Sequence, residues 1–161
     1  MSFARPSAKK ITALAALPFA AALTLSACSG EEETETSFTT SQNGVEMTLT
    51  YTAVGDEVVK QTTSNVIEYE AAGIGSKEEA QELLDPLVEE GADVEGYEQN
   101  IEYGDSSATE EVSIDYKVAD MNELSEVPGF EATANMNDEG AFISLEESRE
   151  MLENQGFTEV E

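Results

Sequence analysis

A strict alternation of apolar and polar residues in the first half of the chain limits its fold more than any other feature. Glutamate and threonine separate the apolar positions of this stretch, which are Val45, Met47, Leu49, Tyr51 and Ala53. Successive side chains of a strand point to opposite faces, so this period of two predicts a strand with one buried face. Gly55 and Asp56 predict a turn into a second strand over 58–69, which has room for a bulge.

After residue 75 the spacing becomes helical. Ser76 and Glu79 form a capping box, and the apolar positions 80, 83, 84, 87 and 88 lie along one helical face. Pro86 costs roughly 3 kcal/mol inside a helix. We therefore expect either a kink there or a new turn capped by Asp85. Gly91 is expected to end the helix.

A second hairpin is predicted over 97–103 and 112–117, around a turn at 104–106. A short helix capped by Asp120 follows, then a brief strand at 142–143, a helix that begins after Ser144 and ends at Gly156, and a final strand over 157–160. This order predicts an α+β domain, an antiparallel sheet built from two hairpins with helices packed on one face.

The residue composition excludes several kinds of chemistry. The 161 residues contain 35 acidic and 7 basic side chains, one Cys, and neither His nor Trp. A Ser-His-Asp triad, a Cys-His pair and an imidazole metal site are therefore excluded. The acidic surface would repel nucleic acid and attract cations or basic proteins. Solvation in a salty exterior explains the acid more simply, and predicts that NaCl raises stability. We expect no cofactor and no enzymatic activity.

The first 27 residues have the layout of a secretory signal peptide. Arg5, Lys9 and Lys10 precede a mostly apolar stretch over 11–25, and no acid occurs before residue 31. This stretch is short for a membrane span, which needs about 20 apolar residues.

The sequence from Leu25 to Cys28, LSAC, resembles the lipobox of bacterial lipoproteins. The resemblance implies cleavage before Cys28 and a diacylglycerol on its sulfur, usually with a further acyl chain on its amine. Two or more acyl chains hold a protein stably at a membrane. The simpler alternative is ordinary secretion with an unmodified Cys28.

Three regions follow from this interpretation: a signal peptide over 1–27, a lipidated Cys28 with an acidic disordered tether over 28–37, and a single domain over 38–161. The domain would lie on the extracytoplasmic face of the cell membrane, which it would contact through the lipid.

Four segments of this domain resemble the YehR-like family of bacterial lipoproteins. They are NGVEMTLTYTAVGDEVVKQTTSN, GSKEEAQELLDPL, IDYKVADMNELSEVPGF and ISLEESREMLENQGFTEV. The resemblance covers roughly residues 38–160 and implies a small cell-envelope lipoprotein of unknown function. It supplies no catalytic residue.

Two local patterns are candidates for binding. Asn135, Asn137, Glu139 and Glu146 have part of the spacing of a calcium loop. A turn followed by the helix that Ser144 caps explains the same residues, and we favour it.

The polar run Lys60, Gln61, Thr62 and Thr63 lies in a predicted strand. It could line a binding face, but we favour the solvated side of an edge strand, where Lys discourages pairing between sheets.

We expect a non-catalytic binding or accessory module whose partner is an envelope protein or a basic protein. A small-solute or divalent-cation receptor that works with a transporter is the alternative, and a carboxylate hydrolase is a third hypothesis.

Overall fold

The computed structural model describes residues 32–130 and 142–160. Its strands are β1 Glu33–Gln42, β2 Val45–Val54, β3 Glu57–Glu68, β4 Tyr97–Tyr103, β5 Ser107–Asp115 and β6 Thr158–Val160. Its helices are α1 Tyr69–Ala72, α2 Lys77–Gly91, α3 Met121–Leu124 and α4 Leu145–Asn154. The metal candidates Asn135, Asn137 and Glu139 lie outside the described residues, as do Cys28 and the predicted signal peptide.

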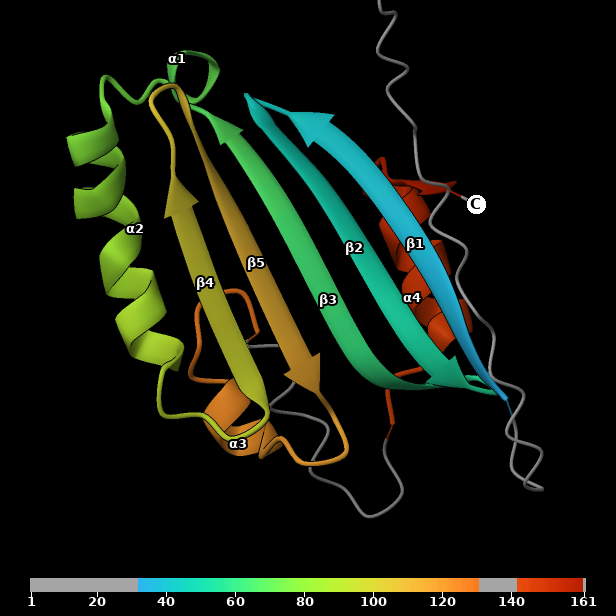
Figure 1. Cartoon of the computed structure of the whole chain (residues 1–161). Helices are drawn as coiled ribbons and strands as arrows, with labels where there is room; N and C mark the ends of the chain where they lie inside the picture. Colours follow the sequence, from blue (N-terminus) through green and yellow to red (C-terminus); the bar gives the residue numbers. More distant parts are fainter. Residues whose placement is uncertain (1–31, 131–141, 161) are drawn as a thin grey trace, which may run out of the picture. The chain divides into compact units, whose positions relative to one another are not determined.

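The six strands form a single antiparallel sheet in the order β4-β5-β3-β2-β1-β6 (Figure 1). The α+β fold class is confirmed. The scheme of two hairpins is incomplete, because β1, β2 and β3 form a three-stranded meander and β6 adds to its edge. The β4–β5 hairpin joins the meander on the other side, through pairing of β5 with β3.

Strand β1 corrects the predicted extent of the tether. Residues 33–37 were expected to be disordered, but they pair with β2 from Glu33 opposite Val54 onward. Phe38, further along β1, is fully buried and lies opposite Leu49. A two-residue turn at Asn43 and Gly44, with φ of 52° and 78°, sets this register.

Strand β3 lies inside the sheet and not at its edge. It pairs with β2 on one side and with β5 on the other, so the edge-strand interpretation of residues 60–63 was wrong. The bulge that the sequence allowed occurs in the β2–β3 pairing, where the register shifts between Thr52 and Ala53.

Local capping signals placed the helices correctly. Ser76 Oγ accepts the Glu79 N–H at 3.2 Å at the start of α2, and Ser144 Oγ accepts the Glu147 N–H at 3.2 Å at the start of α4. Helix α2 continues through Pro86 as one element and includes Gly91. The brief strand predicted at 142–143 does not form, although the Ile143 carbonyl accepts the Val58 N–H at 2.9 Å.

All three clusters of buried side chains lie on the same face of the sheet, which we call the inner face. One cluster joins α4 to β1, β2 and β3 through Leu145 and Leu152. Another joins α3 to β4 and β5 through Leu124, and the third joins α2 to β5 through Ala80. The opposite, outer face carries no helix in the described part of the chain, and Figure 1 views the sheet from that side, with α3 and α4 behind it.

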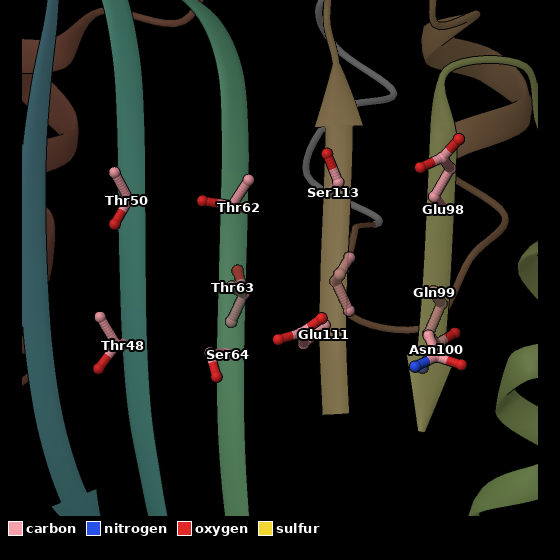
Figure 2. A pocket seen from close by; sticks show the side chains of 11 residues that line it. Thr48, Thr50, Thr62, Thr63, Ser64, Glu98, Gln99, Asn100, Glu111 and Ser113 are labelled. Carbon is pink, nitrogen blue, oxygen red and sulfur yellow. The ribbon is translucent and has the colours of Figure 1, made fainter. Parts of the chain in front are cut away.

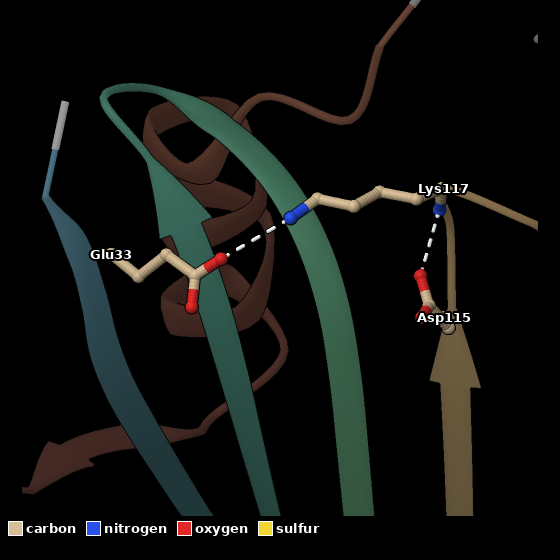
Figure 3. A network of polar contacts seen from close by, with 3 residues as sticks. All are labelled: Glu33, Asp115 and Lys117. Atoms are coloured by element: carbon tan, nitrogen blue, oxygen red, sulfur yellow. Dashed lines mark hydrogen bonds and ion pairs between the residues drawn. The ribbon is translucent and has the colours of Figure 1, made fainter. Parts of the chain in front are cut away.

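An ion pair crosses one end of the outer face. Lys117, which follows β5, extends its Nζ to 3.2 Å from Glu33 Oε1 at the start of β1, and its N–H donates to Asp115 Oδ1 (Figure 3). The side chains of Lys117 and Glu33 are 54% and 58% exposed. Exposed pairs of this kind contribute little to stability.

Candidate functional site

Polar side chains occupy the middle of the inner face, where a core would ordinarily continue. Strand β3 directs Gln61, Thr63 and Asn65 to this face, opposite Tyr51, Leu49 and Met47 of β2. Gln61 and Asn65 are each only 9% exposed. Burying amides costs free energy unless they are hydrogen-bonded. Polar residues at three successive inward-facing positions of a central strand therefore require an explanation.

A groove of about 350 Å³ lies over these residues, between the cluster under α4 and the cluster under α3, and Leu87 of α2 also lines it. Its lining from the sheet is Met47, Leu49, Gln61, Thr63, Asn65, Tyr97, Gln99, Glu110 and Val112, and its remaining lining is Leu87, Val127, Pro128, Gly129 and Phe130. Small-molecule sites are typically concave, of about 300–1,000 Å³, and mostly apolar with a few placed polar groups. The groove meets this description.

Glu110 of β5 organises the polar groups at the floor of the groove. Its Oε2 accepts the Asn65 Nδ2 at 2.6 Å, and its Oε1 accepts the Gln99 Nε2 at 2.5 Å. A carboxylate only accepts hydrogen bonds, so it fixes which end of each amide faces it. The carbonyl oxygens of both amides are therefore directed elsewhere.

The two carbonyl oxygens differ in their partners. Gln99 Oε1 accepts the Tyr97 hydroxyl at 3.0 Å. Asn65 Oδ1 is buried, and no group in the described part of the chain donates to it. A buried acceptor without a donor costs about 1–3 kcal/mol. This oxygen is consequently the clearest sign of a missing binding partner in the described residues.

Two tyrosines complete the polar network. Tyr116 donates its hydroxyl to Gln61 Oε1 at 2.8 Å, and Gln61 Nε2 donates to Thr63 Oγ1 at 3.3 Å. Burial raises the pKa of Tyr97 to about 12, with a smaller contribution from the charge of Glu110, and burial also raises the pKa of Tyr116. Both phenols stay protonated at neutral pH, and their hydroxyls hold the side chains of Gln61 and Gln99 in place.

The outer face has a larger hollow of about 590 Å³ that is built differently (Figure 2). Its outward side chains are Thr48, Thr50, Thr62, Ser64, Ser113, Glu98, Asn100 and Glu111. These are hydroxyls, carboxylates and an amide on an uncovered sheet, and they belong to intermediate or exposed residues. A solvated antiparallel face has this composition without any ligand.

The four predicted binding residues on β3 divide between the faces. Lys60 and Thr62 lie on the outer face, opposite Thr52 and Thr50, whereas Gln61 and Thr63 line the inner groove. Asn65, Gln99 and Glu110 were missed. Their signal was a polar residue at an inward position of each strand, which can be recognised only once the register is known.

The remaining metal candidate, Glu146, lies in the first turn of α4. Its N–H donates to Asp56 Oδ1 at 2.9 Å, and its side chain is exposed. Asp56 Oδ2 also accepts the Ser144 hydroxyl at 2.7 Å, and these bonds lower the pKa of Asp56. The arrangement caps the helix. Within 32–130 and 142–160, no three acidic side chains gather where they could hold a metal ion.

A family model described as a protein of unknown function, DUF1307, matches residues 33–158. The chain belongs to this family. Among its DUF1307 relatives, an uncharacterized lipoprotein of Listeria innocua is 42% identical over 140 residues, which are 87% of this chain and 89% of the relative. The uncharacterized lipoprotein YehR of Escherichia coli is 31% identical over 136 residues, which are 84% of this chain and 87% of the relative. The YehR-like resemblance is confirmed.

Solved structures agree with the fold. The NMR structure of the E. coli YehR protein matches with a TM-score of 0.66 at 30% identity, over 81% of this chain and 93% of that one. The NMR structure of a Streptococcus pneumoniae protein matches with a TM-score of 0.56 at 17% identity, over 97% and 99% of the two chains, which shows the fold alone. None of the helices in the described residues is long and apolar enough to cross a membrane.

Proposed function

We propose that this DUF1307 chain is a cell-envelope lipoprotein, anchored through Cys28, whose domain binds a small ligand non-catalytically in the inner groove. Its relatives in Listeria innocua and E. coli are named as lipoproteins, which supports the anchor together with the LSAC sequence before the domain. The location that follows is the extracytoplasmic face of the cell membrane.

The observation that carries the binding role is the buried Asn65 Oδ1, for which the described residues provide no donor. Asn65 lines the groove together with apolar residues that include Leu87 and Phe130. A volume of about 350 Å³ suits a small molecule better than the surface of an envelope protein. The polar groups of the groove are amides, hydroxyls and one carboxylate that already accepts hydrogen bonds from two amides. This set supports a site that holds a ligand without reacting with it.

The anchor is tested in a bacterial host that processes lipoproteins. Cells are fed labelled palmitate, and the chain is followed through detergent-phase partitioning. The parent chain is expected to carry label and enter the detergent phase, because acyl chains are strongly apolar. The variant Cys28→Ala is expected to lose both properties. Detergent partitioning that survives in this variant would refute the anchor.

The binding role is tested with a fragment library on the ¹⁵N-labelled full chain carrying Cys28→Ser, observed by NMR. At least one fragment class is expected to shift resonances of β3, β4 and β5 at inward positions. Asn65→Ala is expected to weaken these shifts, while Asn100→Ala, on the outward side of β4, serves as the matched control. A complete absence of inward shifts across neutral, cationic and anionic fragments would overturn the binding role.

A further inference from the structure

The floor of the groove carries a negative charge without a basic counterpart. Ion pairs in the described residues join Lys117 to Glu33 and Arg149 to Glu159, and neither involves Glu110. Glu110 is instead held by two neutral amides. A carboxylate offers about four acceptor positions, so two amide donors leave it able to accept more.

Asn65 Oδ1, the buried acceptor without a donor, belongs to a side chain that is hydrogen-bonded to the Glu110 carboxylate. The Asn65 amide donates from Nδ2 to Glu110 at 2.6 Å, and its other end, Oδ1, has no donor among the described residues. The Asn65 carbonyl therefore lacks a donor, and the Glu110 carboxylate beside it can accept further ones. A ligand that carries a carboxylate or phosphate would meet like charge and a second acceptor. A ligand that ends in an ammonium would supply three donors and a positive charge.

The walls suit an ammonium that is joined to an apolar body. Tyr97 and Phe130 pack edge to face, with ring centroids 5.8 Å apart at 78°, and both line the groove beside Leu87 and Val127. Aromatic faces attract cations, and the aliphatic side chains provide apolar surface to cover.

We propose that the inner groove binds a small molecule with a primary ammonium on an apolar body, the ammonium meeting Glu110 and Asn65 Oδ1 and the body lying against Leu87 and Phe130. This assignment rests on the proposed binding function and specifies its ligand class. It also accounts for three consecutive polar positions on a central strand, because they form the polar end of the site.

The test compares three probes of equal chain length: hexylammonium, 1-hexanol and hexanoate. Each is titrated into the ¹⁵N-labelled full chain carrying Cys28→Ser, at about 0.15 M NaCl to screen the acidic surface. Hexylammonium is expected to give saturable shifts at inward positions of β3, β4 and β5. It should bind about tenfold or more tightly than hexanol, because its hydrogen bonds are charge-assisted. Hexanoate should give no inward shifts.

Neighbouring residues of β5 provide a matched pair of variants. Glu110 faces the groove and Glu111 faces the outer side, so Glu110→Gln and Glu111→Gln remove the same charge from opposite faces. Glu110→Gln is expected to weaken hexylammonium about tenfold while leaving hexanol unchanged. Glu111→Gln is expected to leave both unchanged. Circular dichroism and thermal melting confirm that both variants fold.

The outcomes separate this proposal from the binding role itself. Hexanol binding the groove as tightly as hexylammonium would overturn the ammonium assignment and still support a binding module. Hexylammonium shifts that are scattered over the acidic surface and equal in the two Gln variants would show general attraction to a chain of net charge −28, and would also overturn the assignment. Inward shifts that weaken only in Glu110→Gln would support it.

Discussion

Replacing Gly91 by Ala sets two physical effects against each other. Gly91 is the last residue of α2, and an Ala in a helix is favoured over Gly by up to about 1 kcal/mol. A Cβ at this position, however, would lie 2.3 Å from Tyr97 Cε1 and 2.9 Å from Cδ1. The ring cannot move aside freely, because it is 7% exposed, packs against Phe130 and donates its hydroxyl to Gln99.

The clash is expected to outweigh the helix preference. Overpacking a core costs about 1–3 kcal/mol, and displacing the phenol from its hydrogen bond costs about 1 kcal/mol more. Subtracting the helix gain leaves a net loss of about 2 kcal/mol in the free energy of unfolding of Gly91→Ala. For a domain of this size the melting temperature should fall by several degrees.

Urea unfolding of the full chain carrying Cys28→Ser, followed by circular dichroism, measures this loss. Gly75→Ala is the matched control, because its Cβ would meet only Glu79 Oε2, the end of an exposed side chain. The control should stay within about 0.5 kcal/mol of the parent. A Gly91→Ala variant as stable as the parent would refute the argument that the Tyr97 ring is fixed in place.

Four further predictions concern stability. Gly44→Ala should cost about 3 kcal/mol or more in urea unfolding, because φ is +78° and a Cβ would lie 2.5 Å from the Ala71 backbone; a smaller loss would show that the turn rearranges. The lowered pKa of Asp56 means that its stabilisation is present above its ordinary pKa and is lost as the pH falls through the lowered value. Asp56→Asn should therefore melt at a lower temperature at pH 7, with the difference shrinking below about pH 4; a constant difference would contradict the linkage. Lys117→Met should change the free energy of unfolding by less than about 0.5 kcal/mol, because its pair with Glu33 is exposed; a loss above about 1 kcal/mol would show the pair to be stronger than its exposure allows. Finally, NaCl should raise the melting temperature, because it screens repulsion among 35 acidic side chains; an unchanged temperature up to about 1 M would show that this repulsion is negligible.

Sequence patterns predicted the elements that are stabilised by nearby residues. The caps at Ser76, Asp120 and Ser144 involve donors two or three residues away, so a short window of sequence contains the whole interaction. The alternation in β2 was equally clear, because one side of that strand packs on the core. These signals were sufficient to predict the fold class.

Strand β1 escaped prediction because its stability comes from pairing. Of its ten residues only Phe38 is buried, and the others are Glu, Thr, Ser and Gln, a composition that is also typical of a tether. The pair Asn43 and Gly44 was a usable signal, since Asn-Gly strongly favours a hairpin. The chain preceding this turn then has to form the partner strand of β2.

The groove could be anticipated only in part. Gln61 and Thr63 belonged to a polar run visible in the sequence, but their neighbours come from other strands. Asn65 meets Glu110 across 45 residues of sequence, and Glu110 meets Gln99 across the β4–β5 pair. Which residues face each other depends on strand register, which no local pattern contains.

Because β1 starts at Glu33, the linker between the domain and Cys28 is very short if Cys28 is acylated as proposed. Four residues lie between the two positions, and the five steps along the chain span at most about 18 Å even when fully extended. The domain would then stay within about that distance of the lipid.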